Sequence, residues 1–146
     1  MAEGGTYCLI LHLPRRTRIA VGRLGLFDFP AGYYVYVGSA LNGLEARLAR
    51  HLRQDKALHW HVDYLLQHAT LVETWSAISA ERLECRWAEI ASTLPGASLP
   101  VPRFGASDCR CPAHLIHFPT CPEFSLFVNR VAHEHPGLLL AQQRCQ

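Results

Sequence analysis

Arg47 and His51 lie four residues apart in a segment with helical periodicity, so their side chains are neighbours along one helix. The helix is expected over residues 42–53, with Asn42 as its cap and a buried stripe formed by Leu44, Leu48 and Leu52. His51 lies about 60° and Arg47 about 100° from the centre of this stripe, on the same side. A guanidinium and an imidazole at such an edge suit phosphate binding and proton transfer. A solvated helix edge is the alternative.

One carboxylate on a later helix has a comparable position. Residues 81–93 are expected to form a helix with a buried stripe of Leu83, Trp87, Ile90, Ala91 and Leu94. Glu84 lies about 60° from the centre of that stripe, whereas Glu81 and Glu89 lie about 140° away. Of these three glutamates, only Glu84 can reach into a cleft. A carboxylate in a cleft is a possible ligand for a hard divalent cation. The alternative is an ordinary surface charge.

Sulfur and imidazole groups gather late in the chain, in the pattern Cys109-x-Cys111-x₂-His114. Thiolates and imidazoles are the ligands that zinc prefers in structural sites. Cys121 or His117 is the candidate for the fourth ligand. The pattern therefore raises the hypothesis of a zinc site within residues 109–121, which would make the chain a zinc-stabilised interaction domain.

Two other interpretations of this segment stay open. The C-x-C spacing is not the usual C-x₂-C knuckle and Pro112 stiffens the turn, which favours a buried loop. Alternatively, Asp108 and His114 lie at the mouth of the site to which Arg47, His51 and Glu84 belong. Cys8 and Cys85 are expected to be small buried hydrophobic residues.

His59, His61 and Asp63 form a further group whose geometry depends on the local structure. In a helix His59 and Asp63 share a face and His61 does not, whereas in an extended segment all three align. Metal binding is one interpretation of this group. The aromatic neighbours, Trp60 and Tyr64, are expected to pack in the core.

The positive charge is carried almost entirely by arginine. Of the 14 basic residues 13 are arginine, and residues 1–58 hold eight basic residues against four acidic ones. Arginine favours bidentate contacts with phosphate, although genome composition explains the same bias. The candidate nucleic-acid contacts are Arg15, Arg16, Arg18, Arg50 and Arg53.

The remaining pattern predicts one α+β domain over residues 1–146. Strands are expected over residues 6–13, 19–24, 33–37, 70–78 and 115–118, and further helices over 59–68 and 124–135. The apolar runs are far shorter than the roughly 20 residues of a membrane span, and the N-terminus lacks a secretory signal. The sequence therefore predicts a cytoplasmic protein with no membrane partner.

The first strand opens with Gly5-Thr6-Tyr7 and the third ends with Tyr36-Val37-Gly38. These motifs, followed by Arg47 and His51 on the next helix and by Glu84 on a later one, resemble the GIY-YIG nuclease superfamily. Residues 5–118 resemble a subgroup of poorly characterised domains, found alone or attached to endonuclease-III-like repair enzymes. Residues 119–146 are expected to be a helical C-terminal extension, and the long connection over residues 15–30 leaves room for an added strand.

The resemblance implies a small mixed or antiparallel sheet flanked by helices. It also implies that Tyr7, Tyr36, Arg47 and His51 act as catalytic residues on one face of this sheet, with Glu84 as the metal ligand. The implied function is a Mg²⁺- or Mn²⁺-dependent endonuclease that acts on DNA rather than RNA, with a role in DNA repair. The alternative is a non-catalytic nucleic-acid-binding module with the same fold, in which the two tyrosines are ordinary core aromatics.

Overall fold

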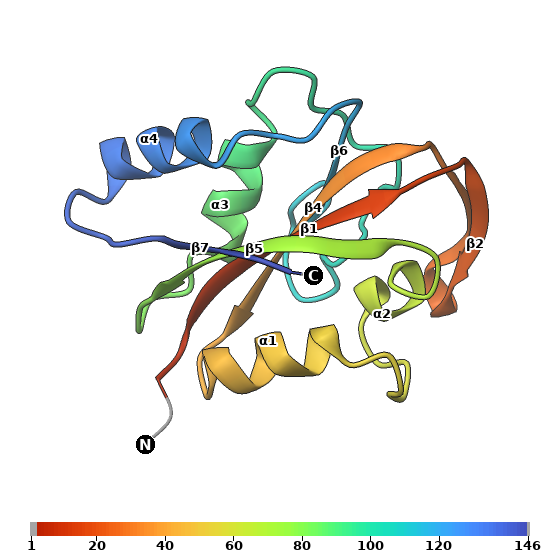
Figure 1. Ribbon diagram of the computed structural model, residues 1–146, viewed down its shortest axis with the longest axis horizontal. Coiled ribbons are helices and arrows are strands. Elements are labelled where there is room, and N and C mark those ends of the chain that lie inside the picture. The colour runs from red at the N-terminus through yellow and green to blue at the C-terminus, as the bar shows by residue number, and fades with distance from the viewer. Residues whose placement is uncertain (1–2, 146) are drawn as a thin grey trace.

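A computed structural model describes residues 3–145 of the chain (Figure 1). The strands are β1 (Gly5–Leu13), β2 (Thr17–Val21), β3 (Gly25–Phe29), β4 (Gly32–Ala40), β5 (Thr70–Ile78), β6 (Leu115–Phe118) and β7 (Ala141–Arg144). The helices are α1 (Leu44–Leu52), α2 (His61–Leu65), α3 (Glu84–Ala91) and α4 (Phe124–Glu134). Five strands form an antiparallel sheet in the order β6-β4-β1-β5-β7, and β2 and β3 form a separate hairpin. The predicted α+β class is confirmed.

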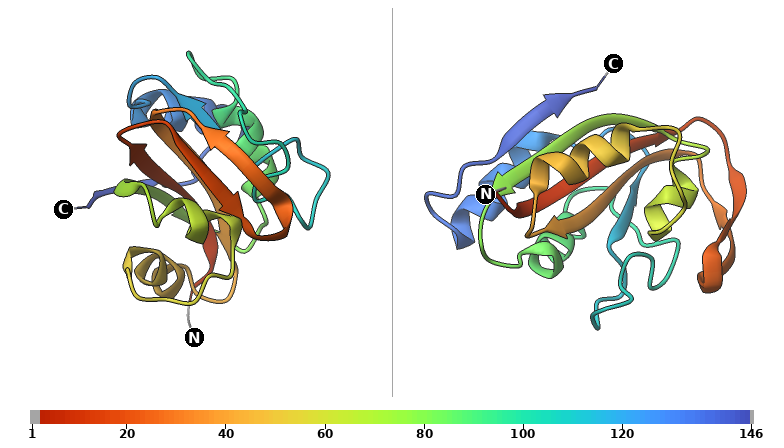
Figure 2. Two further views of the ribbon diagram at one scale, coloured as in Figure 1. Left: turned by 90° about the vertical axis from the view of Figure 1, so that its right-hand side faces the viewer. Right: turned by 90° about the horizontal axis from the view of Figure 1, so that it is seen from below.

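The central strand β1 is apolar on both sides because both faces of the sheet are covered. Side chains of a strand alternate between faces, so Tyr7 and Leu9 belong to one core cluster and Cys8 and Ile10 to the other. Helices α1 and α2 cover the Tyr7 face, and α3 and α4 cover the opposite face (Figure 2). The two helices on which the predicted site residues lie, α1 and α3, are therefore on opposite sides of the sheet.

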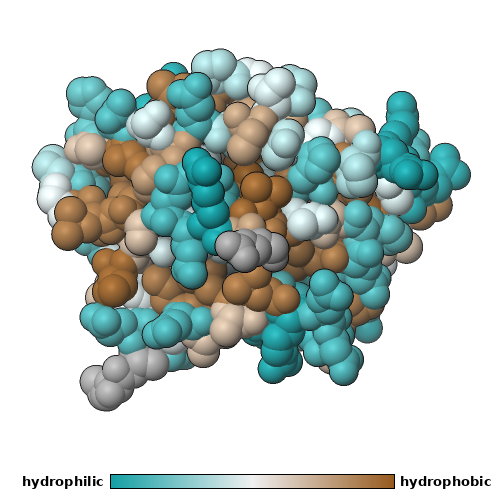
Figure 3. Space-filling model, viewed as in Figure 1, coloured by the Kyte–Doolittle hydropathy of each residue, from teal (hydrophilic) through white to brown (hydrophobic). Residues whose placement is uncertain are grey.

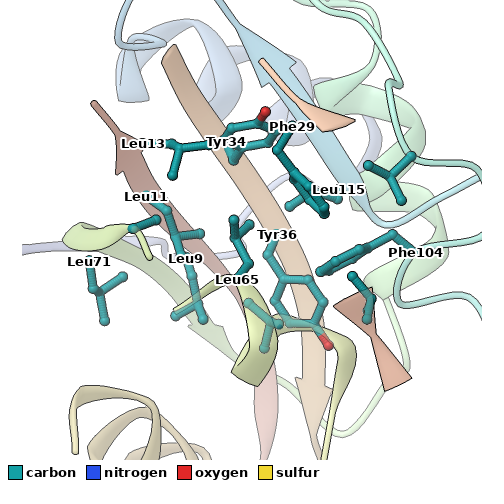
Figure 4. Close-up of a cluster of buried hydrophobic side chains, with 14 of the residues drawn as sticks. Leu9, Leu11, Leu13, Phe29, Tyr34, Tyr36, Leu65, Leu71, Phe104 and Leu115 are labelled. Carbon is teal, nitrogen blue, oxygen red and sulfur yellow. The ribbon is translucent and has the colours of Figure 1, made fainter. Parts of the chain in front are cut away.

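The core on the Tyr7 face joins aliphatic side chains of the sheet to aromatic side chains from loops. Figure 4 shows Leu9 and Leu11 of β1 beside Tyr36, whose ring lies between Leu65 of α2 and Phe104. The Tyr36 hydroxyl points away from the leucine side chains in this view. A strand aromatic in this position has an apolar body in the core and a polar tip at its border.

Helix α1 differs in detail from the predicted helix. Gly43, not Asn42, is the N-cap residue, and it has no side chain to cap the first turn. Leu52 is 51% exposed, whereas His51 is 2% exposed. Leu44 and Leu48 of the predicted stripe do pack on the core, but at the end of the helix His51 takes the buried position that was predicted for Leu52.

The segment predicted as a helix over residues 59–68 contains only the short helix α2. Asp63 is 1% exposed, and its Oδ2 accepts hydrogen bonds from the backbone nitrogens of His59 and Trp60 at 2.8 and 2.9 Å. His61 is turned elsewhere, because its Nδ1 accepts a hydrogen bond from the Gly105 nitrogen at 2.7 Å. His59, His61 and Asp63 therefore do not form a metal site: their polar atoms cap the helix and tie down a loop.

Two strands differ from the sequence prediction. The segment between the tyrosine motifs does contain an added strand, β3, which pairs with β2, so the strand predicted over residues 19–24 ends at Val21. The C-terminal extension contains the predicted helix α4 and also β7, which pairs with β5 at the edge of the sheet. The chain end therefore adds a strand to the sheet, which a purely helical extension would not do.

The outer surface beside α1 is partly apolar. A groove of about 740 Å³ lies between α1 and β7, lined in part by Leu44, Ile78 and Leu139. Figure 3 shows apolar side chains lying among polar ones on the face that carries α1, β5 and β7. Among residues 3–145, no helix has the length and apolar character required to cross a bilayer.

Replacing Asp63 by alanine should destabilise the fold. The carboxylate is buried, pairs with Arg50 and accepts two backbone hydrogen bonds at the start of α2, so its removal leaves all of these groups unpaired. We expect the free energy of unfolding to fall by about 3 kcal/mol in urea titration. The matched change at exposed Asp55 should cost less than about 0.5 kcal/mol. Equal costs at the two positions would contradict this role of Asp63.

Candidate active site at the edge of strand β4

Strand β4 has a partner strand on its outer edge over only part of its length. Strand β6 pairs with Tyr33–Tyr36 and stops there. At Val37 the backbone nitrogen donates to the His114 oxygen at 2.9 Å, and His114 Nδ1 donates to the Val37 oxygen at 3.2 Å. Two residues further on, the Ser39 oxygen accepts a hydrogen bond from Arg47 Nη1 at 3.1 Å. Side chains from α1 and from the loop before β6 therefore replace a strand at this edge.

The glycines of the two tyrosine motifs are there for steric reasons. In the β1–β4 register Tyr7 lies opposite Gly38, and a Cβ on Gly38 would be 2.5 Å from the Tyr7 hydroxyl oxygen. A Cβ on Gly5 would be 2.2 Å from the Ala77 carbonyl oxygen. Gly38 lets the Tyr7 ring lie flat against β4, and Gly5 lets β1 and β5 approach closely.

Tyr7, Tyr36 and His51 form the floor of the site. The Tyr7 hydroxyl is 2.9 Å from His51 Nε2, within one hydrogen bond. The Tyr36 ring centroid is 6.4 Å from that of Tyr7 and 6.4 Å from that of His51. All three side chains are nearly closed to solvent, at 1%, 6% and 2% exposure respectively.

Burial changes the acidity of all three floor residues. It raises the pKa of Tyr7 to about 12, which hydrogen bonding and charge from Arg47 oppose. It also raises the pKa of Tyr36 well above its ordinary value. The pKa of His51 falls to about 3, chiefly through burial, although the Asp63 charge acts in the other direction. At neutral pH the floor therefore consists of two phenols and a neutral imidazole.

Arg47 and Glu84 form the half-buried rim of the site. Besides its bond to Ser39, the Arg47 guanidinium carbon lies 4.3 Å from the centre of the Trp60 ring. This cation–π contact and the hydrogen bond hold the guanidinium above the phenols. Glu84 is the first residue of α3, which packs against β4. Its charge also acts, after burial and other groups, to raise the pKa of both Tyr7 and Tyr36.

Glu84 is held at this edge by the start of α3. The Leu83 nitrogen donates to Thr6 Oγ1 at 3.4 Å, next to Tyr7 in β1. One carboxylate oxygen of Glu84, Oε2, is buried and has no hydrogen-bond partner among residues 3–145. Such an oxygen is costly to bury unpaired and is the kind of ligand that Mg²⁺ or Mn²⁺ takes. The donor set at Glu84 thus fits a hard divalent cation.

The structure brings the five predicted residues together, but not on one face of the sheet. Tyr7, Tyr36, Arg47 and His51 lie on the side of α1, whereas Glu84 belongs to α3 on the other side. They meet because β4 has no strand partner beyond Tyr36, so both helices reach its edge. The right-hand view in Figure 2 shows β4 passing between α1 and α3.

The candidate nucleic-acid contacts divide into exposed and engaged arginines. Arg15 and Arg53 are exposed, and Arg16 and Arg18 are exposed but pair with Asp28. Arg50, which the sequence predicts as a nucleic-acid contact, does not point into solvent. Its guanidinium stacks on Trp60 at 4.3 Å and makes two hydrogen bonds of 3.1 Å to the buried Asp63 carboxylate. Arg50 is thus engaged in holding α1 and α2 together.

Three of the predicted late ligands lie in one group with a fourth residue that the sequence did not indicate. Their ligand atoms all lie within 4.8 Å of one another, so the group has the geometry to hold a metal ion. We call it the thiol–imidazole cluster; its members are Cys85, Cys109, Cys111 and His114.

The fourth member, Cys85, was predicted to be a small buried hydrophobic residue. It lies instead half-buried in the first turn of α3, directly after Glu84, and its Sγ is 3.7 Å from His114 Nε2. Burial, together with hydrogen bonding to the neighbouring thiols, raises the pKa of Cys85 to about 12. No spacing pattern in the sequence marks Cys85 as a ligand, because it precedes Cys109 by a helix and a loop.

The other predicted partners of the cluster lie elsewhere. His117 Nε2 donates to the Ala31 oxygen at 2.8 Å, across the sheet edge near the start of β4. Cys121 is exposed after β6, and Asp108 is an exposed loop residue outside the cluster. The prediction of Cys121 or His117 as fourth ligand is therefore wrong, because β6 carries both away from Cys109.

Comparison with known proteins gives one match. A family model described as Domain of unknown function DUF123 matches residues 6–135, which include every member of the floor, the rim and the cluster. Neither a curated protein nor a solved structure matches the chain.

Replacing Gly38 by alanine should displace the Tyr7 ring. The new methyl group would lie within 3.0 Å of three atoms of the buried Tyr7 side chain, so we expect a loss of about 2 kcal/mol in urea unfolding. The same change in a Tyr7→Leu background should cost less, because the ring is gone. An equal cost in both backgrounds would show that Tyr7 is not the residue that requires glycine at position 38.

Because of His51, the free energy of unfolding should fall as the pH is lowered from about 6.5 to 3. Its pKa is lowered in the folded state, so in this range the unfolded chain binds the proton that the folded chain excludes. One such proton contributes up to about 1.4 kcal/mol per pH unit. Urea midpoints at pH 7, 6 and 5 should decline less steeply for His51→Gln than for the wild type. Exposed His68→Gln should follow the wild type, and an unchanged slope in His51→Gln would refute the role of His51.

Proposed function

The chain belongs to the family Domain of unknown function DUF123, and we propose that it is a divalent-metal-dependent endonuclease of the GIY-YIG kind, acting on DNA. One observation carries this proposal. Two phenols, a neutral imidazole, a guanidinium and a carboxylate with an unpaired oxygen meet at one free strand edge. These are the groups that hydrolysis of a phosphodiester requires.

Arg47 is the proposed phosphate-binding residue. Ser39 and Trp60 hold its guanidinium in place before substrate arrives, so little reorganisation is needed to meet the charge on the phosphoryl oxygens. A planar guanidinium also matches the geometry of two phosphate oxygens. Arg47 is half-buried, which strengthens its interaction with an anion compared with a fully solvated arginine.

Glu84 is the proposed ligand of a Mg²⁺ or Mn²⁺ ion. Its Oε2 is buried and unpaired, and the hydrogen bond from Leu83 to Thr6 ties the start of α3 to β1 next to Tyr7. A divalent cation bound there would supply charge to polarise the phosphate and to stabilise the leaving oxygen. A single carboxylate suits Mg²⁺, which keeps most of its water ligands.

Tyr7, Tyr36 and His51 are the proposed groups for the nucleophilic water. Both phenols are protonated at neutral pH, so they begin as donors that orient the water and the phosphate. The Arg47 charge favours the phenolate of Tyr7 and thereby its use as a base. His51, neutral and 2.9 Å away, is positioned to relay the proton that Tyr7 releases.

The exposed arginines support a nucleic acid as the substrate. Arg15 and Arg53 are exposed, and Arg16 and Arg18 extend a basic surface along the β2–β3 hairpin. Contacts of this kind bind the phosphate backbone without reading sequence. Branched and nicked DNA, the substrates of repair, are the class we propose to test.

A second candidate function is a nucleic-acid-binding module without catalysis. The observation in its favour is the floor itself, because Tyr7, Tyr36 and His51 are all at most 6% exposed. In that case DNA would bind with strong salt dependence and stay intact. Cleavage that requires a metal separates the two candidates.

We do not propose the thiol–imidazole cluster as the site of the catalytic Mg²⁺ ion. Thiolates are soft ligands that select zinc, whereas carboxylate oxygens suit Mg²⁺ and Mn²⁺. We therefore propose Glu84, and not the cluster, as the ligand for the hard cation.

Labelled branched, nicked and single-stranded DNA should be cleaved in the presence of Mg²⁺ or Mn²⁺ and stay intact with EDTA. Changing Glu84→Gln or Arg47→Ala should lower the cleavage rate about 100-fold. The first weakens the binding of the metal ion and the second removes a positive charge that would bind the phosphate. The matched controls are Glu81→Gln, just before α3, and Arg144→Ala, on β7 at the opposite edge of the sheet. Both alter exposed residues and should stay within twofold of the wild type.

Circular dichroism and unfolding curves should be alike for the variants and their controls. Cleavage that persists in Glu84→Gln and Arg47→Ala belongs to another site or to a contaminant, and it would refute the proposal. Salt-dependent binding without any cleavage would select the second candidate.

A further inference from the structure

The thiol–imidazole cluster has the dimensions of a tetrahedral zinc site. Bond lengths of about 2.3 Å to sulfur and 2.0 Å to nitrogen imply edges of about 3.5 Å between sulfur and nitrogen. The Sγ atoms of Cys85 and Cys109 lie 3.7 and 3.5 Å from His114 Nε2. Three thiols and one imidazole are a common ligand set for structural zinc.

His114 is oriented as a metal-binding histidine. Its Nδ1 donates to the Val37 carbonyl oxygen at 3.2 Å, so the proton lies on Nδ1 and the lone pair of Nε2 points at the thiols. A backbone carbonyl on the second ring nitrogen is the usual way in which proteins fix the tautomer of such a ligand. His114 is also 3% exposed, so its position does not depend on solvent.

Arg103 shapes the loop that carries two of the thiols. Its guanidinium donates to the backbone oxygens of Cys109 at 2.7 Å and of Cys111 at 2.6 Å. Arg103 itself has φ 66°, a left-handed conformation that is uncommon outside glycine. The loop is thus wrapped around its own arginine, whose positive charge would offset the net negative charge of three thiolates and a divalent ion.

We infer that the thiol–imidazole cluster binds one zinc ion as a closed structural site. All four positions of a tetrahedral ion are filled by protein atoms, which leaves no open position for substrate. The remaining two cysteines with side chains near the surface, Cys121 and Cys145, lie outside the cluster.

The position of the zinc site gives it a role beyond stabilising a loop, and this part rests on the function proposed above. Cys85 follows Glu84 in the first turn of α3, and His114 is bonded through both backbone and ring to Val37, between Tyr36 and Gly38. Zinc would therefore join α3 to β4 beside the candidate active site. The ion makes Cys85 a positioning residue for Glu84.

Metal analysis tests the inference without any use of cleavage. Protein purified under reducing conditions, with neither added zinc nor a metal-affinity column, should contain one zinc per chain by mass spectrometry of the native protein. Exchange into Co²⁺ should give the intense visible bands of tetrahedral cobalt and the near-ultraviolet bands of thiolate ligands. Cys111→Ser should lose at least 90% of the metal, whereas exposed Cys121→Ser should retain it.

A folded wild type with neither zinc nor the cobalt spectrum would overturn the inference. So would a disulfide between any two of the three cluster cysteines, or equal metal loss in Cys121→Ser. If Cys111→Ser does not fold, His114→Cys provides a second test, because a four-thiolate site should keep cobalt and shift its bands. Unchanged bands in that variant would also count against the assignment.

The positioning role has its own readout. Zinc-free or Cys111→Ser protein should need at least tenfold more Mn²⁺ for half-maximal DNA cleavage, because Glu84 is less well fixed. General unfolding would instead lower the maximal rate and leave the Mn²⁺ requirement unchanged. One zinc per chain with no cleavage in the wild type would leave the zinc site standing and refute the nuclease. Cleavage by a wild-type protein that contains no zinc would refute the zinc site and leave the nuclease proposal standing.

Discussion

The register between β1 and β4 places the Tyr7 ring over Gly38, and the candidate site depends on this contact. With a glycine there, the hydroxyl of Tyr7 reaches His51 on α1, and the Tyr36 ring can lie beside both. A shift of one residue in the register would send Tyr7 to the opposite face, because side chains of a strand alternate. The second requirement is that β6 pairs with β4 only as far as Tyr36, since this leaves the rest of the β4 edge open to Arg47 and His114.

The site combines a rigid floor with charged residues at its border. Burial keeps the two phenols protonated and His51 neutral, so the floor carries no net charge at neutral pH. Charge enters only at the rim, through Arg47 and Glu84, each held by a neighbouring element. This division is suited to a reaction in which a charged phosphate approaches from solvent, because the groups that must change protonation are shielded from bulk water.

Local patterns were sufficient for most of the fold, and they failed where contacts distant in sequence decide. Runs of β-forming apolar residues and helical periodicity predicted β1, β5, β6 and α4 closely, and half-buried Glu84 was correctly separated from exposed Glu89. The helix predicted over residues 81–93 is shorter, because α3 begins at Glu84 and Glu81 lies before it. The edge strand β7 is polar and exposed, so no apolar pattern marks it. Arg50 was predicted as a nucleic-acid contact because a helical wheel cannot show Asp63. Cys85 was predicted to be a buried hydrophobic residue because its three partners in the cluster come from a loop beyond the helix.

The central claim is that Glu84 holds a divalent cation beside Tyr7 and Tyr36. The most direct measurement is a crystal soaked in Mn²⁺, with anomalous difference maps for the wild type and for Glu84→Gln. We expect an anomalous peak bonded to Glu84 Oε2 in the wild type, facing the phenols, and its absence in the variant. A wild-type map with no peak at Glu84, from crystals of protein that cleaves DNA with Mn²⁺, would contradict the account.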